Sequence, residues 1–170
     1  MRFRGHLVGG CVAGVALAEV AVQSGNVSHY DFNAWGQLFA LTLFFSLFPD
    51  LDTSSIPQRW FFRAVLACML VLALFDRYRL AALLGVVALL PVIDHHRGWT
   101  HWRLSPLIIP TLLFLLFGFR NVTQTDGSLP DGIQFVWGNM IYLVACVVGW
   151  YSHLLLDGYF KLFPTDRDHH

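Results

Sequence analysis

Residues 108–119 read IIPTLLFLLFGF, and residues 66–75 read LACMLVLALF, without a charged side chain in either run. A helix built from either run is apolar on every face, whereas a helix at the surface of a soluble bundle needs a polar outer face. Over the 170 residues, 56% are hydrophobic and only 13% are charged, while a typical soluble domain carries about 25% charged residues. The sequence therefore predicts an all-α polytopic membrane protein.

Six apolar segments follow one another along the chain and are separated by short polar stretches. They cover residues 7–22, 34–48, 60–75, 80–93, 104–119 and 135–156. The first five are shorter than the roughly 20 residues of a full transmembrane helix, so we expect flanking aromatic and arginine side chains to extend them into the headgroups. No linker is long enough to separate domains. We predict one integral membrane domain over residues 1–170 with about six transmembrane helices.

The distribution of basic residues predicts the orientation of these helices. If all six segments span and the N-terminus is cytoplasmic, eight of the eleven Lys and Arg residues lie on the cytoplasmic side. The positive-inside rule then favours cytoplasmic N- and C-termini and a multi-pass inner-membrane location. We expect the N-terminal run to be kept as the first span rather than cleaved as a signal peptide, because no clear small-x-small site precedes a polar domain.

Charge and cysteine content exclude two classes of site. The formal net charge is zero, so no basic surface indicates a nucleic-acid partner. Cys11, Cys68 and Cys146 each lie in an apolar run without a C-x-x-C pair. We expect them to be buried hydrophobic residues rather than disulfides or zinc thiolates.

Histidine and aspartate residues recur at the ends of four of the six segments. Because successive spans alternate in direction, the topology places all of them at the cytoplasmic face. They are His6 before the first segment, Asp50 and Asp52 after the second, Asp94, His95, His96 and His101 after the fourth, and His153 and Asp157 at the end of the sixth.

The chemistry of this set suits a metal site. Ionisable groups at membrane depth are costly and usually functional. His153 and Asp157 are spaced i, i+4 and share a helix face, while Asp50 and Asp52 would repel each other without a cation between them. Imidazole and carboxylate ligands favour zinc, with manganese and iron as alternatives. The number of side chains is sufficient for two or three ions.

Each candidate residue receives an expected role. Seven residues are predicted metal ligands: His6, Asp50, Asp52, His96, His101, His153 and Asp157. Of these, Asp50, Asp52 and His101 are also candidate catalytic residues, together with Arg97, which either holds an anionic substrate or simply obeys the positive-inside rule. Asp94, His95 and Thr100 are expected to support the ligands. The alternatives are an interfacial role for His6, a turn cap for Asp50 and a helix cap for Asp52.

The motifs FPDLD (48–52), HRGWTH (96–101) and SHLLLD (152–157), after an N-terminal histidine, resemble those of the YdjM-type, LexA-regulated inner-membrane proteins. The resemblance implies a metal-dependent hydrolase that is distantly similar to zinc-dependent phospholipases C and single-strand nucleases, with the seven ligands named above. The sequence departs from the family pattern at Trp102, where a serine usually follows HRG-x-TH.

These observations predict a membrane-bound metal-dependent hydrolase that acts on a phosphoester or a lipid-related ester at the cytoplasmic face. Its expected partners are the bilayer and a phospholipid or phosphoester substrate. The first alternative is a metal or proton transporter, since intramembrane His and Asp can form an ion path. The second is a non-catalytic membrane factor with a structural metal.

Overall fold

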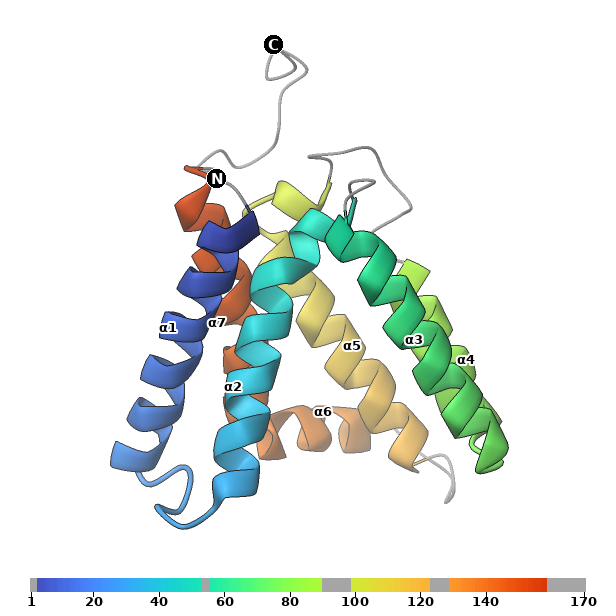
Figure 1. Ribbon diagram of the computed structural model, residues 1–170. Coiled ribbons are helices and arrows are strands. Elements are labelled where there is room, and N and C mark those ends of the chain that lie inside the picture. Colours follow the sequence, from blue (N-terminus) through green and yellow to red (C-terminus); the bar gives the residue numbers. More distant parts are fainter. Residues whose placement is uncertain (1–2, 53–55, 90–98, 123–128, 159–170) are drawn as a thin grey trace. The chain divides into compact units, whose positions relative to one another are not determined.

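The computed structural model of the chain describes residues 3–52, 56–89, 99–122 and 129–158. Within these ranges it is all-α and contains no strand, which confirms the all-α part of the predicted fold class. In chain order (Figure 1), the helices and 3-10 turns are α1 (Phe3–Gln23), α2 (Phe32–Leu47), η1 (Phe48–Asp52), α3 (Ile56–Leu74), α4 (Tyr78–Leu89), η3 (Trp99–His101), α5 (Ser105–Val122), α6 (Leu129–Gly138) and α7 (Met140–Leu156).

The chain divides into two compact units. The first comprises Met1–Leu47 with His101–His170, and the second comprises Phe48–Thr100. In the second unit, α3 packs against α4 and against η1, and the Gln58 side chain donates a hydrogen bond to the Leu51 carbonyl (2.9 Å). The prediction of one membrane domain stays a prediction.

Helices α1, α2 and α7 pack against one another in the first unit (Figure 1). Small side chains allow this close approach, as is common between membrane helices. A Cβ added at Gly149 on α7 would collide with the backbone of Thr42 on α2. The buried hydrophobic core between these helices consists of Ala18, Ala21, Val27, Ala34, Leu38 and Ala145.

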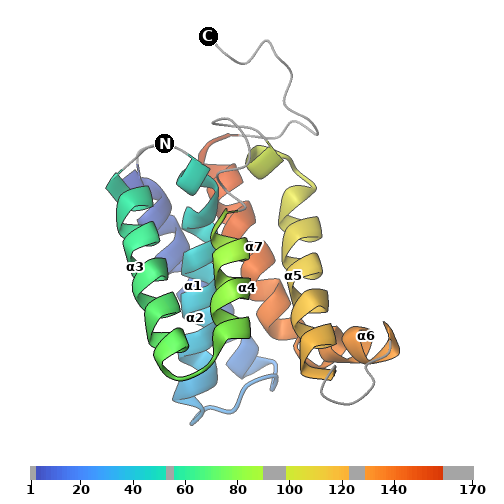
Figure 2. The same cartoon turned by 90° about the vertical axis from the view of Figure 1, so that its right-hand side faces the viewer.

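The sixth apolar segment, predicted as one span, is broken into α6 and α7 at Asn139. The two helices meet at an angle of 75°, and α6 lies across the ends of α5 and α7 (Figures 1 and 2). The Asn139 side chain donates a hydrogen bond to the Phe135 carbonyl (2.9 Å) and so satisfies an acceptor near the break. An asparagine after a glycine favours this interruption, because its side chain competes for backbone hydrogen bonds.

Two of the described helical segments are long and apolar enough to cross a membrane, namely Arg4–Gln23 and Phe32–Leu51. A third span is present if the bent pair Gly132–Gly138 and Met140–Leu156 counts as one. Leu80–Leu89 and Ser105–Leu116 are shorter apolar helices. The structure thus supports two to three spans by length and composition, and the six-span topology stays a prediction.

Candidate metal centre

Four side chains of the first unit come together, from α1, from the end of α7 and from the last residue of η3. His6 lies near the start of α1, and His153 lies in the last turn of α7. Asp157 follows α7 as its C-cap, and His101 ends η3. The three histidines are almost completely buried, and the side chain of Asp157 is 9% exposed. Sequence positions that are far apart therefore form one buried cluster.

The Asp157 carboxylate is the common neighbour of the three imidazoles. Its Oδ1 lies 3.1 Å from His6 Nε2, and its Oδ2 lies 3.5 Å from His153 Nε2 and 4.0 Å from His101 Nε2. The rings of His6 and His153 are stacked with centroids 3.9 Å apart. One ligand atom from each of His6, His153 and Asp157 lies within 4.8 Å of the others, which is compatible with a shared metal ion.

The orientation of His153 is set by the backbone of α2. Its Nδ1 lies 2.9 Å from the Ser46 carbonyl oxygen. A carbonyl can only accept, so Nδ1 carries the proton and donates. In the neutral ring, Nε2 then keeps its lone pair and faces Asp157. Metal-binding histidines are commonly fixed in this way by a hydrogen bond at the other nitrogen.

The environment of His6 fits a metal ligand. Its side chain is fully buried, and neither ring nitrogen makes a hydrogen bond to any described residue. Although Nε2 is close to Asp157, the contact lacks hydrogen-bond geometry. A buried polar group without such a bond costs about 1–3 kcal/mol. A metal ion between the imidazole and the carboxylate would remove this cost, and the donor set suits zinc.

Asp157 is ionised in this environment. Burial raises the pKa of its carboxyl group, but the close approach of the His6 and His153 imidazoles lowers it more, so the net pKa lies below the ordinary value. Gly158 follows with a φ of 72°. Glycine adopts this left-handed conformation without strain, so the helix ends at the residue that supplies the carboxylate.

The remaining predicted site residues belong to the second unit or lie outside the described residues. Asp50 is half-buried in η1 of the second unit, and Thr100 is buried next to His101 in η3. The side chain of Asp52 and the whole of Asp94, His95, His96 and Arg97 lie outside the described residues.

Two contacts at the site were not predicted from the sequence. The Ser46 carbonyl that orients His153 is a backbone group, so no side-chain pattern could have indicated it. The Tyr151 hydroxyl donates a hydrogen bond to the Arg103 carbonyl (2.8 Å) and ties the chain after His101 to α7. Tyr151 stands two residues before His153, but a tyrosine in an apolar helix is too common to indicate such a tie.

The fold and the site together define an α-helical membrane protein with a candidate His/Asp metal centre at one end of its helices. The family model described as "YdjM inner membrane protein" matches residues 1–162. The chain therefore belongs to the YdjM inner membrane protein family, which confirms the resemblance drawn from its motifs. No curated protein and no solved structure matches the chain significantly.

Proposed function

We propose that this protein is an integral membrane hydrolase with a zinc ion bound by His6, His153 and Asp157. The observation that carries the proposal is the buried His6 imidazole, which faces Asp157 without making a hydrogen bond. Three protein ligands and an open position are typical of catalytic zinc sites, whereas structural sites are closed by four. When bound, the ion supplies an activated water and stabilises negative charge.

His101 is placed to assist proton transfer. Its Nε2 lies 4.0 Å from Asp157, farther than that of His6 or His153, and its ring meets His153 edge-on at 5.4 Å. An imidazole beside the ligands can accept a proton and return it to a leaving group near neutral pH. In the proposal, His101 holds that proton at Nε2.

The proposal extends to residues outside this cluster. Asp50, Asp52 and His96 are proposed as ligands of one or two further ions, and Arg97 is proposed to hold a phosphate oxygen pair. A phosphoester or a lipid-related ester at the cytoplasmic face is the proposed substrate class, because the His/Asp cluster is at the ends of apolar helices.

The location of the cluster favours hydrolysis over transport. His6 stands near the start of α1, while Ser46 and His153 stand near the ends of α2 and α7. Transporters usually place their ion sites near the middle of the bilayer, at interrupted helices. The interruption in this chain, at Asn139, is at the opposite end of α7 from His153.

A substrate panel tests the proposed activity. The purified full-length protein is loaded with zinc and assayed with soluble phosphomonoesters, phosphodiesters and phospholipids in mixed micelles. We expect hydrolysis of at least one class that disappears on chelation and in Asp157→Asn, but persists in Asp76→Asn, where the altered carboxylate is exposed between α3 and α4. Tightly bound zinc without turnover of any class would contradict the hydrolase and indicate a structural metal. Zinc uptake into liposomes without turnover would indicate a transporter.

A further inference from the structure

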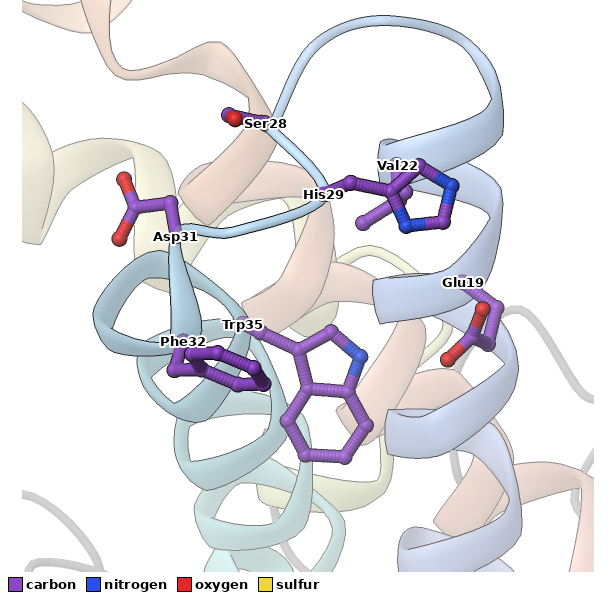
Figure 3. Close-up of a pocket in the computed structure, with 7 residues that line it drawn as sticks. All are labelled: Glu19, Val22, Ser28, His29, Asp31, Phe32 and Trp35. Carbon is purple, nitrogen blue, oxygen red and sulfur yellow. The ribbon is translucent and has the colours of Figure 1, made fainter.

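A second polar site lies at the other end of the α1–α2 hairpin. A cavity of about 360 Å³ opens between the end of α1, the connecting loop and the start of α2 (Figure 3). Its wall includes Glu19 and Val22 of α1, His29 of the loop, and Phe32 and Trp35 of α2. Glu19 follows His6 by thirteen residues on one helix, which separates the cavity from the metal centre by roughly 20 Å.

Glu19 gives this cavity a negative charge. It is the only glutamate in the sequence, and it lies in the apolar helix α1, within the candidate span Arg4–Gln23. The second carboxylate of the wall, Asp31, is already engaged as the N-cap of α2. Its Oδ1 accepts a hydrogen bond from the Ala34 backbone N–H (2.9 Å). Figure 3 shows the Asp31 carboxylate pointing away from Glu19 and Trp35. Among the described residues, the wall contains no lysine or arginine.

Aromatic rings form the apolar part of the same wall. Trp35 is half-buried and packs against the hydrophobic core of the first unit, so its indole is held in place. Phe32 is 81% exposed and stands one helical turn before it. An ammonium group is attracted to an aromatic face, most strongly to that of tryptophan. A single carboxylate beside an indole therefore suits an organic cation.

A metal ion fits this cavity less well. Zinc needs several donors converging on one point, and among the described residues only His6, His153 and Asp157 meet that condition. Glu19, His29 and Asp31 do not converge on a common point. The aromatic rings of the wall can pack against the carbon atoms of a ligand and attract its positive charge, but they offer no atom that binds a metal ion.

We propose that this cavity binds an organic ammonium group, with Glu19 balancing its charge and Trp35 and Phe32 packing against its carbon atoms. The hairpin joins two candidate spans, Arg4–Gln23 and Phe32–Leu51, so the cavity lies where helices leave the bilayer. Two sources of an ammonium group have access to this cavity, namely the headgroup of a lipid and a free amine in solution. The site is separate from the proposed hydrolase centre and does not depend on it.

Binding of labelled choline to the full-length protein tests the proposal. The protein is placed in nanodiscs of phosphatidylglycerol, which lacks an amine, and sodium chloride at equal ionic strength is the reference. We expect saturable choline binding that weakens about tenfold in Glu19→Gln and about threefold to tenfold in Trp35→Leu. Trp35→Phe, which keeps an aromatic face, should recover part of the affinity. The matched controls are Asp76→Asn and Trp137→Leu, which alter an exposed acid and an exposed tryptophan outside the cavity wall.

The source of the ammonium is resolved by changing the lipid. If nanodiscs that contain phosphatidylethanolamine weaken choline binding in the wild type, a headgroup occupies the cavity; if they leave it unchanged, a free amine is the ligand. Both results support an ammonium site. A choline signal no larger than the signal from sodium chloride at equal ionic strength would overturn the proposal. Equal choline affinity of Glu19→Gln and the wild type would also overturn it. Zinc that displaces choline from the wild type and binds Glu19→Gln less tightly would overturn it in favour of a metal site.

Discussion

At the scale of single residues, the candidate centre is organised around Asp157. One carboxylate contacts two imidazoles within 3.5 Å and faces a third at 4.0 Å. Removing such a charge from water is costly, and the cost is repaid only when partners surround it. The depressed pKa of this carboxyl group shows that the surroundings favour its ionised form despite burial.

The first prediction concerns acid release of the metal. Because the folded pKa of Asp157 is lowered, the stability that its carboxylate contributes is complete above its ordinary pKa of about 4 and is lost only as pH falls through the lower folded value. Imidazoles ordinarily protonate at about pH 6.5 and must be neutral to bind metal. We therefore expect zinc binding to weaken as the pH falls below about 7, because protons compete with the ion for the imidazoles.

Zinc retention measured after dialysis over this pH range checks the prediction. The carboxylate keeps its charge throughout, so the release reports the histidines. A zinc affinity that does not change between about pH 7 and pH 5 would contradict imidazole ligation.

At the scale of elements, the centre depends on how closely α2 and α7 approach. The Thr42 backbone occupies the space that a Cβ at Gly149 would need. One helical turn further along α7, His153 meets the Ser46 carbonyl of α2 at 2.9 Å. The spacing of the two helices and the orientation of the ligand are thus set by the same packing surface.

The second prediction compares two glycines in apolar helices. Gly149→Ala should force α2 and α7 apart, destabilise the protein by about 1–3 kcal/mol and weaken zinc binding. Gly36→Ala on α2 is the matched control, because a Cβ there meets nothing within 4 Å. This control should be neutral or stabilising by up to about 1 kcal/mol. Thermal unfolding and zinc titration in detergent measure both effects, and equal behaviour of the two variants would show that the contact does not support the site.

The helices and the pairing of His153 with Asp157 could be predicted from the sequence, for identifiable reasons. Long apolar runs leave few alternatives to helices in a membrane, and the i, i+4 spacing of His153 and Asp157 places both on one face. The break at Asn139 was missed because hydropathy averages across a single polar residue. The contact of His153 with the Ser46 carbonyl could not be predicted from the sequence. It depends on the rotation of α7 against α2, which side-chain periodicity does not specify.

At the scale of the whole molecule, the cluster constrains the topology. His6 stands near the start of α1 and Asp157 follows the end of α7, yet they are 3.1 Å apart. Two residues that touch lie at the same membrane face, so an even number of crossings must separate them. Helices α1 and α2 account for two crossings, and the bent pair α6–α7 adds a third if it counts as one span. An even number then needs one more crossing in the first unit, and we expect the apolar helix α5 to supply it. Helices α3 and α4 should then either both cross the membrane or both not cross it.

The third prediction follows from this parity. Reporters fused before α1 and after the last residue should indicate the same side, and the basic residues predict that this side is cytoplasmic. A reporter inserted after Ser28, in the loop between α1 and α2, should indicate the opposite side. Signals from opposite sides for the two terminal fusions would mean an odd number of crossings and would contradict the cluster.

The central claim, a metal held by His6, His153 and Asp157, is tested most directly by the metal content of the purified full-length protein. Elemental analysis after zinc loading and desalting should give about one equivalent or more in the wild type and in Asp76→Asn. His6→Ala should retain several-fold less, since it removes one of three ligands. Equal zinc in His6→Ala and the wild type, or none in either, would contradict the account.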